Sequence, residues 1–178
     1  DGDPAFWDLS DSDVAAFQAA DLILLNGANY EKWRDHVSLP ESAVVDTSAA
    51  FADQLIEIQE GVTHSHGADG EHSHAGTAFT TWLDFNLAKL QAKAVLEALQ
   101  ALLPGEDDTL SENYSALVSD LVKLDGTMKL AAEGTGETPL FVSHPVYHYL
   151  SKAYNLKTED VLWEPEVVPS EDQLTELS

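Results

Sequence analysis

The sequence predicts an α/β fold with two small parallel-sheet lobes joined by one long helix. Four short apolar runs have the length of buried strands: 21–25, 43–46, 140–143 and 161–163. Helical patterns alternate with these runs, and this alternation favours parallel strands. A much longer helical pattern, from about Leu110 to Ala132, separates the first pair of strands from the second.

Capping and turn signals define the elements of the amino-terminal half. Ser10 and Asp13 resemble a capping box, which predicts a helix that ends near position 20. Asn26 and the glycine after it close the first strand. We expect one or two helical turns within Tyr30–His36, whereas Gln54–Gly61 is ambiguous.

Helices dominate the predicted carboxy-terminal half. Asp84 can cap a helix that ends before Pro104, and the long helix follows. Four leucines of the long helix form one stripe: Leu117, Leu121, Leu124 and Leu130. Pro145 is well placed to begin a helix that reaches Tyr154, and Ser170 opens a last helix. This half is too short to complete a sheet of its own.

The composition is acidic and lacks cysteine. Among 178 residues, 32 Asp and Glu oppose 8 Lys and Arg, for a formal net charge of −24. Such a surface repels nucleic acid and anionic lipid but attracts cations, although it is equally typical of a merely solvated surface. The 44% apolar content supports a real core, and no apolar run could span a membrane. Without thiolates, a transition-metal site must use His, Asp, Glu and water.

A histidine-rich loop at 63–75 is the strongest chemical signal in the chain. It contains two His-x-His units, with Asp69 and Glu71 between them, and its histidines are His64, His66, His72 and His74. Histidines two apart in an extended segment point the same way, so each unit can chelate one ion. Imidazole suits zinc, copper and nickel, and zinc needs about four ligands. The alternative is a polar loop with incidental histidines.

The loop does not match the His-x-His-x-Asp-His pattern of metallohydrolases. Ala68 lies two residues after His66, and Gly70 follows Asp69. The sequence also contains no recognisable nucleophile–base pair or phosphate-binding glycine loop. We therefore predict a binding protein rather than an enzyme, with no catalytic residues.

His144 and His148 form a second candidate metal site. His144 follows a predicted strand, and ligands of open α/β sheets bind at the carboxyl ends of strands. If the next helix begins at once, His148 lies one turn further on the same face. The alternative is a capping His144 and a surface His148. His36 is a lone histidine without a partner motif.

These residues resemble a known family, the zinc- and manganese-type extracytoplasmic solute-binding proteins of bacterial ABC transporters (cluster A-I). Segments in matching order and spacing carry the resemblance: Ser10–Gly27, the histidine-rich loop, Trp82–Asp84, Phe141–Leu156 and Pro169–Ser170. The resemblance implies an amino-terminal lobe at 1–107, a linking helix at 108–133 and part of a carboxy-terminal lobe at 134–178. It also implies that metal binds between the lobes, that His144 is a ligand, and that the chain is incomplete at both ends.

The sequence departs from the family pattern at the other ligands. The family's first histidine aligns with Ala5 or its neighbours, and the second aligns with Thr80. An acidic fourth ligand would lie beyond Ser178. We expect Phe6, Trp7 and Thr80 to line the altered cleft.

The predicted function is therefore metal binding, with zinc or another divalent transition metal, in an ABC-type metal uptake system. The expected partners are the membrane permease and the metal ion, and we expect a monomer that binds no nucleic acid. The location would be extracytoplasmic, in the periplasm or at the cell surface, with or without a lipid anchor. The alternative is a module of the same fold that has lost cleft metal and recognises another solute or a protein.

Overall fold

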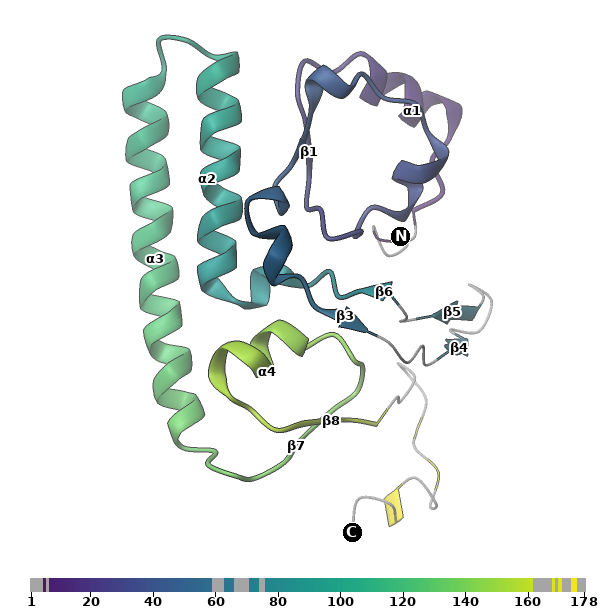
Figure 1. Cartoon of the computed structure of the whole chain (residues 1–178), viewed down its shortest axis with the longest axis vertical. Coiled ribbons are helices and arrows are strands. Elements are labelled where there is room, and N and C mark those ends of the chain that lie inside the picture. Colours follow the sequence, from purple (N-terminus) through teal and green to yellow (C-terminus); the bar gives the residue numbers. More distant parts are fainter. Residues whose placement is uncertain are drawn as a thin grey trace.

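Two long antiparallel helices form one side of the molecule (Figure 1). The computed structural model describes residues 5, 7–58, 63–65, 71–73, 76–161, 168, 170 and 174–175. Helix α2 (Phe85–Leu102) begins where the Asp84 carboxylate accepts a 2.8 Å hydrogen bond from the Asn86 amide, as its capping role predicts. After a turn at Gly105, whose φ is +111°, helix α3 (Asp107–Glu133) continues for 27 residues, about 40 Å.

The amino-terminal lobe contains the parallel pair β1 (Ile23–Leu25) and β2 (Val44–Asp46). Helix α1 (Asp11–Gln18) precedes it, and the predicted capping box at Ser10 is present. Three short 3-10 helices complete this part: η2 (Lys32–His36), η3 (Glu41–Ala43) and η4 (Ala49–Gln54). Its core consists of four buried side chains: Ile23, Leu25, Trp33 and Leu39.

The apolar run of the first strand predicted burial on both faces, but only one face is buried. Ile23 and Leu25 are buried, but Leu24 between them is 41% exposed. Successive side chains of a strand point to opposite faces, and the described residues cover only the face of Ile23 and Leu25. The burial part of the prediction was therefore wrong, although the strand itself is confirmed.

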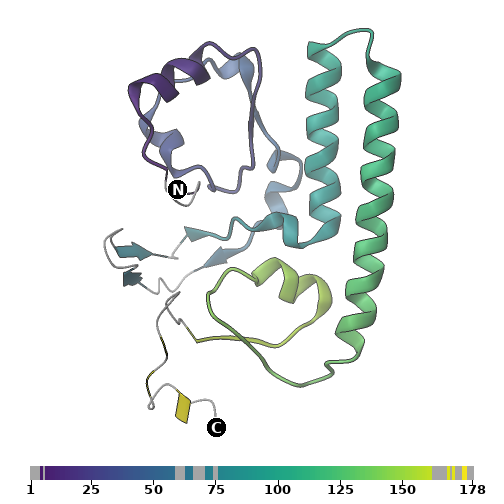
Figure 2. The same ribbon diagram turned by 180° about the vertical axis from the view of Figure 1, so that it is seen from behind.

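The second parallel pair consists of β7 (Leu140–Val142) and β8 (Thr158–Asp160), with helix α4 (His148–Tyr154) between them. The sequence placed the second strand of this pair at 161–163, but the residues that pair with β7 are Thr158–Asp160. Val161 follows β8, and 162–163 lie outside the described residues. The predicted helix start at Pro145 was wrong. The chain first makes a tight turn, in which the Val146 amide donates a 2.9 Å bond to the His144 carbonyl. Figure 2 shows both lobes stacked along the same side of α2 and α3.

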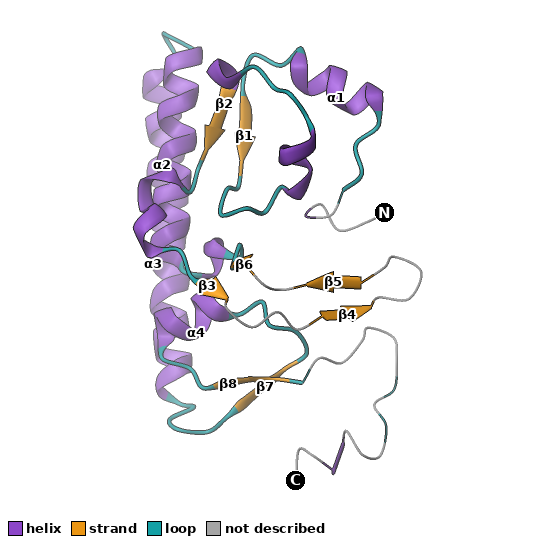
Figure 3. Cartoon of the chain, turned by 45° about the vertical axis from the view of Figure 1, so that its right-hand side comes forward, coloured by secondary structure: helices purple, strands orange, loops and turns teal. Residues whose placement is uncertain are grey.

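Short antiparallel pairs lie between the two lobes. Strand β3 (Glu57–Ile58), in the segment left ambiguous above, pairs with β6 (Gly76–Thr77). Strand β4 (Thr63–Ser65) pairs with β5 (Glu71–Ser73), and Figure 3 shows this pair projecting away from α2 and α3. After β6, the 3-10 helix η6 (Thr81–Leu83) leads into α2.

A second buried cluster connects the two lobes. Its members come from η4, the segment after β6, α2 and α4: Phe51, Ala78, Leu87 and Tyr149. Phe51 is completely buried and Tyr149 is 1% exposed. Helix α4 thus packs against amino-terminal residues, which places the residues before it next to the segment that carries Thr80.

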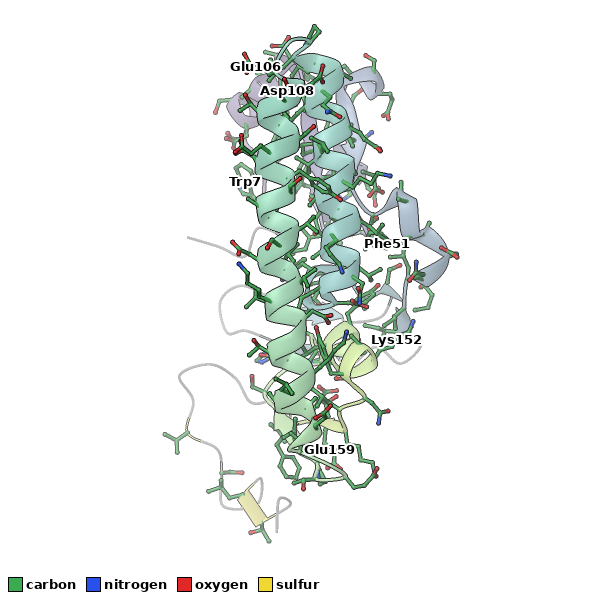
Figure 4. The ribbon with its side chains drawn as sticks, turned by 90° about the vertical axis from the view of Figure 1, so that its left-hand side faces the viewer. Trp7, Phe51, Glu106, Asp108, Lys152 and Glu159 are labelled. Atoms are coloured by element: carbon green, nitrogen blue, oxygen red, sulfur yellow. The ribbon has the colours of Figure 1, made fainter. Side chains whose placement is uncertain are left out.

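The long helix α3 is more exposed than its leucine stripe suggested. Leu117, Leu124 and Leu130 are 49%, 50% and 71% exposed, and Leu121 is half-buried. The helix nevertheless bonds to α4 at one point, because the Tyr154 hydroxyl donates a 3.0 Å bond to the buried Asp125 carboxylate. Figure 4 shows the outer side of α3, with Glu106 and Asp108 at one end and Glu159 near the other.

Candidate metal centre

The histidine-rich segment includes the β4–β5 pair. Its antiparallel register places His64 directly opposite His72, with Thr63 opposite Ser73 and Ser65 opposite Glu71. Residues directly opposite each other in such a ladder lie on the same face of the sheet. The backbone therefore brings one histidine of each His-x-His unit into register. His66 and His74 lie outside the described residues.

The second pair of histidines lies around a turn rather than along a helix. His144 follows β7, and α4 begins only at His148. The helical spacing that was expected to align the two imidazoles therefore does not apply. Both residues are half-buried, and Pro145 between them is buried.

One ring nitrogen of His148 is buried without a partner. Its Nδ1 atom is inaccessible and has no hydrogen-bond partner among the described residues. An unsatisfied buried polar atom costs about 1–3 kcal/mol. His148 therefore retains an unused donor or acceptor beside the turn that carries His144.

Thr80 contacts this turn directly. Its side chain is almost buried, at 8% exposed, and its hydroxyl donates a short hydrogen bond to the Val146 carbonyl. Ala5, at or beside the other position where the resemblance places a histidine, is completely buried. Both positions therefore hold small, enclosed side chains. Trp7, expected in the cleft, packs edge-on against Phe17 of α1, and Phe6 lies outside the described residues.

The Tyr149 hydroxyl attaches the first turn of α4 to the amino-terminal lobe. It donates a 3.0 Å bond to the Ala78 carbonyl and accepts a 3.1 Å bond from the Ile56 amide. A tyrosine hydroxyl is protonated at neutral pH, and burial raises the pKa of Tyr149 further. One side chain of α4 thus satisfies two backbone groups of the amino-terminal lobe.

A polar network that the sequence analysis missed lies beneath the segment at 78–81. The Gln91 amide nitrogen donates 3.0 Å bonds to Asn26 oxygens and to the Thr47 hydroxyl. The Thr81 hydroxyl donates a 3.1 Å bond to the Gln91 side-chain oxygen. The sequence contained a signal for two members of this network. Asn26 and Thr47 directly follow predicted parallel strands, and the carboxyl ends of such strands meet at one edge of the sheet. Nothing in the spacing of Gln91 in α2 singled it out.

The described histidines do not by themselves complete a coordination sphere. Within the part of the chain that the structure describes, no three His, Asp or Glu side chains gather closely enough to hold an ion. A tetrahedral zinc site with one or two of these imidazoles would need further ligands or water. The same described residues contain no helix long and apolar enough to cross a membrane.

Comparison with known proteins identifies the family. A family model described as zinc-uptake complex component A, periplasmic (ZnuA), matches residues 1–178, the whole chain. The chain belongs to this family. The family consists of solute-binding components rather than enzymes, in agreement with the resemblance drawn from the sequence.

Individual ZnuA-family relatives are distant. The chain is 27% identical over 186 residues to the high-affinity zinc uptake system protein ZnuA of Bacillus subtilis, covering 98% of this chain and 56% of that protein. It is 27% identical over 161 residues to the zinc-binding protein TroA of Treponema pallidum, covering 88% and 48%. An iron-binding protein of Yersinia pestis, YfeA, is 26% identical over 153 residues, covering 85% and 46%. The chain thus spans about half the length of the curated relatives it matches.

Solved ZnuA-family structures share the fold. The metal-dependent lipoprotein YcdH of Bacillus subtilis superposes with a TM-score of 0.79 at 22% identity, covering 99% of this chain and 61% of that one. Periplasmic TroA of Treponema pallidum superposes with a TM-score of 0.71 at 24% identity, covering 98% and 61%. The α/β architecture predicted from the sequence, with small parallel sheets and a long helix, is therefore confirmed.

Proposed function

We propose that this chain is the metal-binding part of an extracytoplasmic solute-binding protein that delivers zinc to an ABC transporter permease. Membership of the ZnuA family and the names of two relatives, a zinc uptake protein and a zinc-binding protein, support this proposal. The third relative is named for iron, so a second divalent metal belongs in any test. The proposed location is the periplasm or the cell surface.

The observation that carries the proposal is the register of β4 and β5. It sets His64 opposite His72 within a segment of four closely spaced histidines, and imidazole is a preferred ligand of zinc. The net charge of −24 would concentrate cations near this hairpin. We propose His64, His66, His72 and His74 as an accessory capture site. His144, with His148, is proposed as the cleft site, completed by ligands or water beyond the described residues.

Zinc calorimetry on matched variants tests this function. Wild type should bind zinc at two kinds of site. Replacing all four hairpin histidines by alanine should remove one of them, and His144→Ala in that background should weaken the other at least tenfold. His36→Ala should change nothing, because His36 is exposed and belongs to neither group. The titration is made in excess calcium, which binds carboxylates in preference to imidazole and so suppresses zinc binding by surface carboxylates. A wild type that binds zinc no better than calcium would refute the function.

A second candidate function follows from Ala5 and Thr80. Because one is completely buried and the other is bonded to Val146, the cleft could have exchanged its metal for another solute or a protein partner. Under this alternative, His144→Ala would leave zinc binding unchanged in the hairpin variant. A zinc site lost on that substitution would exclude it.

A further inference from the structure

Two hydrogen bonds attach the turn before α4 and the first turn of α4 to a single short segment of the amino-terminal lobe. The Thr80 hydroxyl donates to the Val146 carbonyl, and the Tyr149 hydroxyl donates to the Ala78 carbonyl. The two attachment points are two residues apart on one segment and three apart on the other. The bonded residues are separated by 66 and 71 positions in the chain. Tertiary contacts thus hold the chain at Val146, where the turn ends, and at Tyr149, in the first turn of α4.

Both candidate metal-binding histidines lie next to these attachment points. His148 directly precedes Tyr149, and His144 lies two residues before Val146. The Val146 amide also bonds to the His144 carbonyl, so the first attachment point and His144 belong to the same tight turn. The two attachment points flank His148 and lie just after His144, so they restrict the positions that the two imidazoles can take.

The segment that holds the turn is itself firmly anchored. The Asn26 side-chain amide donates a 3.1 Å bond to the Phe79 carbonyl, between the two attachment points. Thr81, which is completely buried, bonds to Gln91 of α2. These contacts connect the segment to the end of β1 and to α2, so it can restrain the turn rather than move with it.

We propose that Thr80 is a positioning residue for the cleft site: with Tyr149, it holds the turn carrying His144 and His148 in one conformation before an ion arrives. The inference rests on the proposed zinc binding by these histidines. A ligand that is already ordered loses less entropy on coordination, so preorganisation raises affinity. The resemblance places a histidine ligand at the position of Thr80. In this chain Thr80 instead acts on His144 and His148 through its bond to Val146.

The test uses the full chain without its four hairpin histidines, so that cleft binding is measured alone. Thr80→Val removes the hydroxyl and keeps the shape, and it should weaken zinc affinity about fivefold, the value of one net hydrogen bond. Thr80→Ser restores the donor and should bind within twofold of the parent. Thr127→Val is the matched control, because that hydroxyl also donates to a backbone carbonyl, Lys123, but on the exposed side of α3.

Amide hydrogen exchange without metal gives a second readout. Thr80→Val should accelerate exchange at Val146 and Ser151, whose amides are bonded within the turn and the first turn of α4, and leave the middle of α2 unchanged. Tyr149→Phe releases the other attachment point and should act in the same direction.

The outcomes separate the two proposals. If the Thr80→Val protein is less stable but binds zinc as tightly as its parent, Thr80 has only a structural role and the positioning role is contradicted. If no variant binds zinc in this background, the proposed cleft function fails, and exchange alone decides the positioning role. Unchanged exchange at Val146 and Ser151 would overturn it.

Discussion

The two histidine groups of this protein are positioned in different ways. His64 and His72 belong to β4 and β5, which, within the described part of the chain, pair only with each other. His144 and His148 lie before and after a turn, and two long-range hydrogen bonds, at Val146 and at Tyr149, attach this part of the chain to the amino-terminal lobe. The hairpin depends on local pairing, whereas the turn depends on tertiary contacts.

This difference predicts different energetics. A two-stranded hairpin is marginally stable in water, so a metal that orders it must offset the loss of chain entropy. The turn is ordered when the whole chain folds, so the entropy cost of ordering it is already included in the free energy of folding. Substitutions around the turn should therefore change stability, and substitutions in the hairpin should not.

The largest effect is expected at Tyr149. Tyr149→Phe keeps the packing with Phe51 but leaves the Ile56 amide and the Ala78 carbonyl without their partner. We expect the free energy of unfolding to fall by about 2–3 kcal/mol, measured in urea. Tyr114→Phe, on the half-buried side of α3, should change it by less than about 0.5 kcal/mol. Equal losses in both variants would contradict the role assigned to this hydroxyl.

A smaller, pH-dependent effect is expected at Asp125. Its bond to Lys129, and then its bond to Tyr154, hold the pKa of this carboxyl below its usual range. A lowered pKa stabilises the fold above the ordinary carboxyl pKa, and this stabilisation is lost as pH falls through the lowered value. Asp125→Asn should therefore cost about 1 kcal/mol at pH 7 and progressively less in acid.

Unfolding in urea at several pH values measures this difference. Asp120→Asn is the control, because Asp120 forms an exposed pair with Lys123 on the same helix. An exposed pair contributes little, so its variant should follow wild type at every pH within about 0.5 kcal/mol. An Asp125→Asn cost that stays constant down to pH 3 would argue against the lowered pKa.

The smallest effect on stability is expected in the hairpin. Ser65→Pro removes an amide hydrogen from β4, and Ser65→Ala keeps it. Because β4 pairs only with β5 among the described strands, the unfolding free energy should change by less than about 0.5 kcal/mol. Zinc binding by the hairpin should weaken in the proline variant alone. A large loss of global stability would show that the hairpin is part of the core after all.

Local signals predicted the elements well where one residue decides the conformation. Ser10 and Asp13 form the expected capping box, and Asp84 caps α2. The start of α4 was missed because Pro145 is compatible with a helix but also with the tight turn that Val146 and Thr80 stabilise. The sequence analysis missed β8 for a similar reason. An apolar run marks residues that can be buried, whereas pairing with β7 selects Thr158–Asp160.

The sequence by itself determined the α/β class, the long helix, the two histidine groups and the family, because each depends on residue type and spacing along the chain. Only the tertiary structure decided what surrounds His144 and His148. The bonds of Thr80 and Tyr149, and those of Gln91 to Asn26 and Thr47, join residues more than forty positions apart, from 44 between Thr47 and Gln91 to 93 between Ile56 and Tyr149. No local propensity encodes such a contact. It forms because the buried cluster of Phe51, Ala78, Leu87 and Tyr149 brings those segments together.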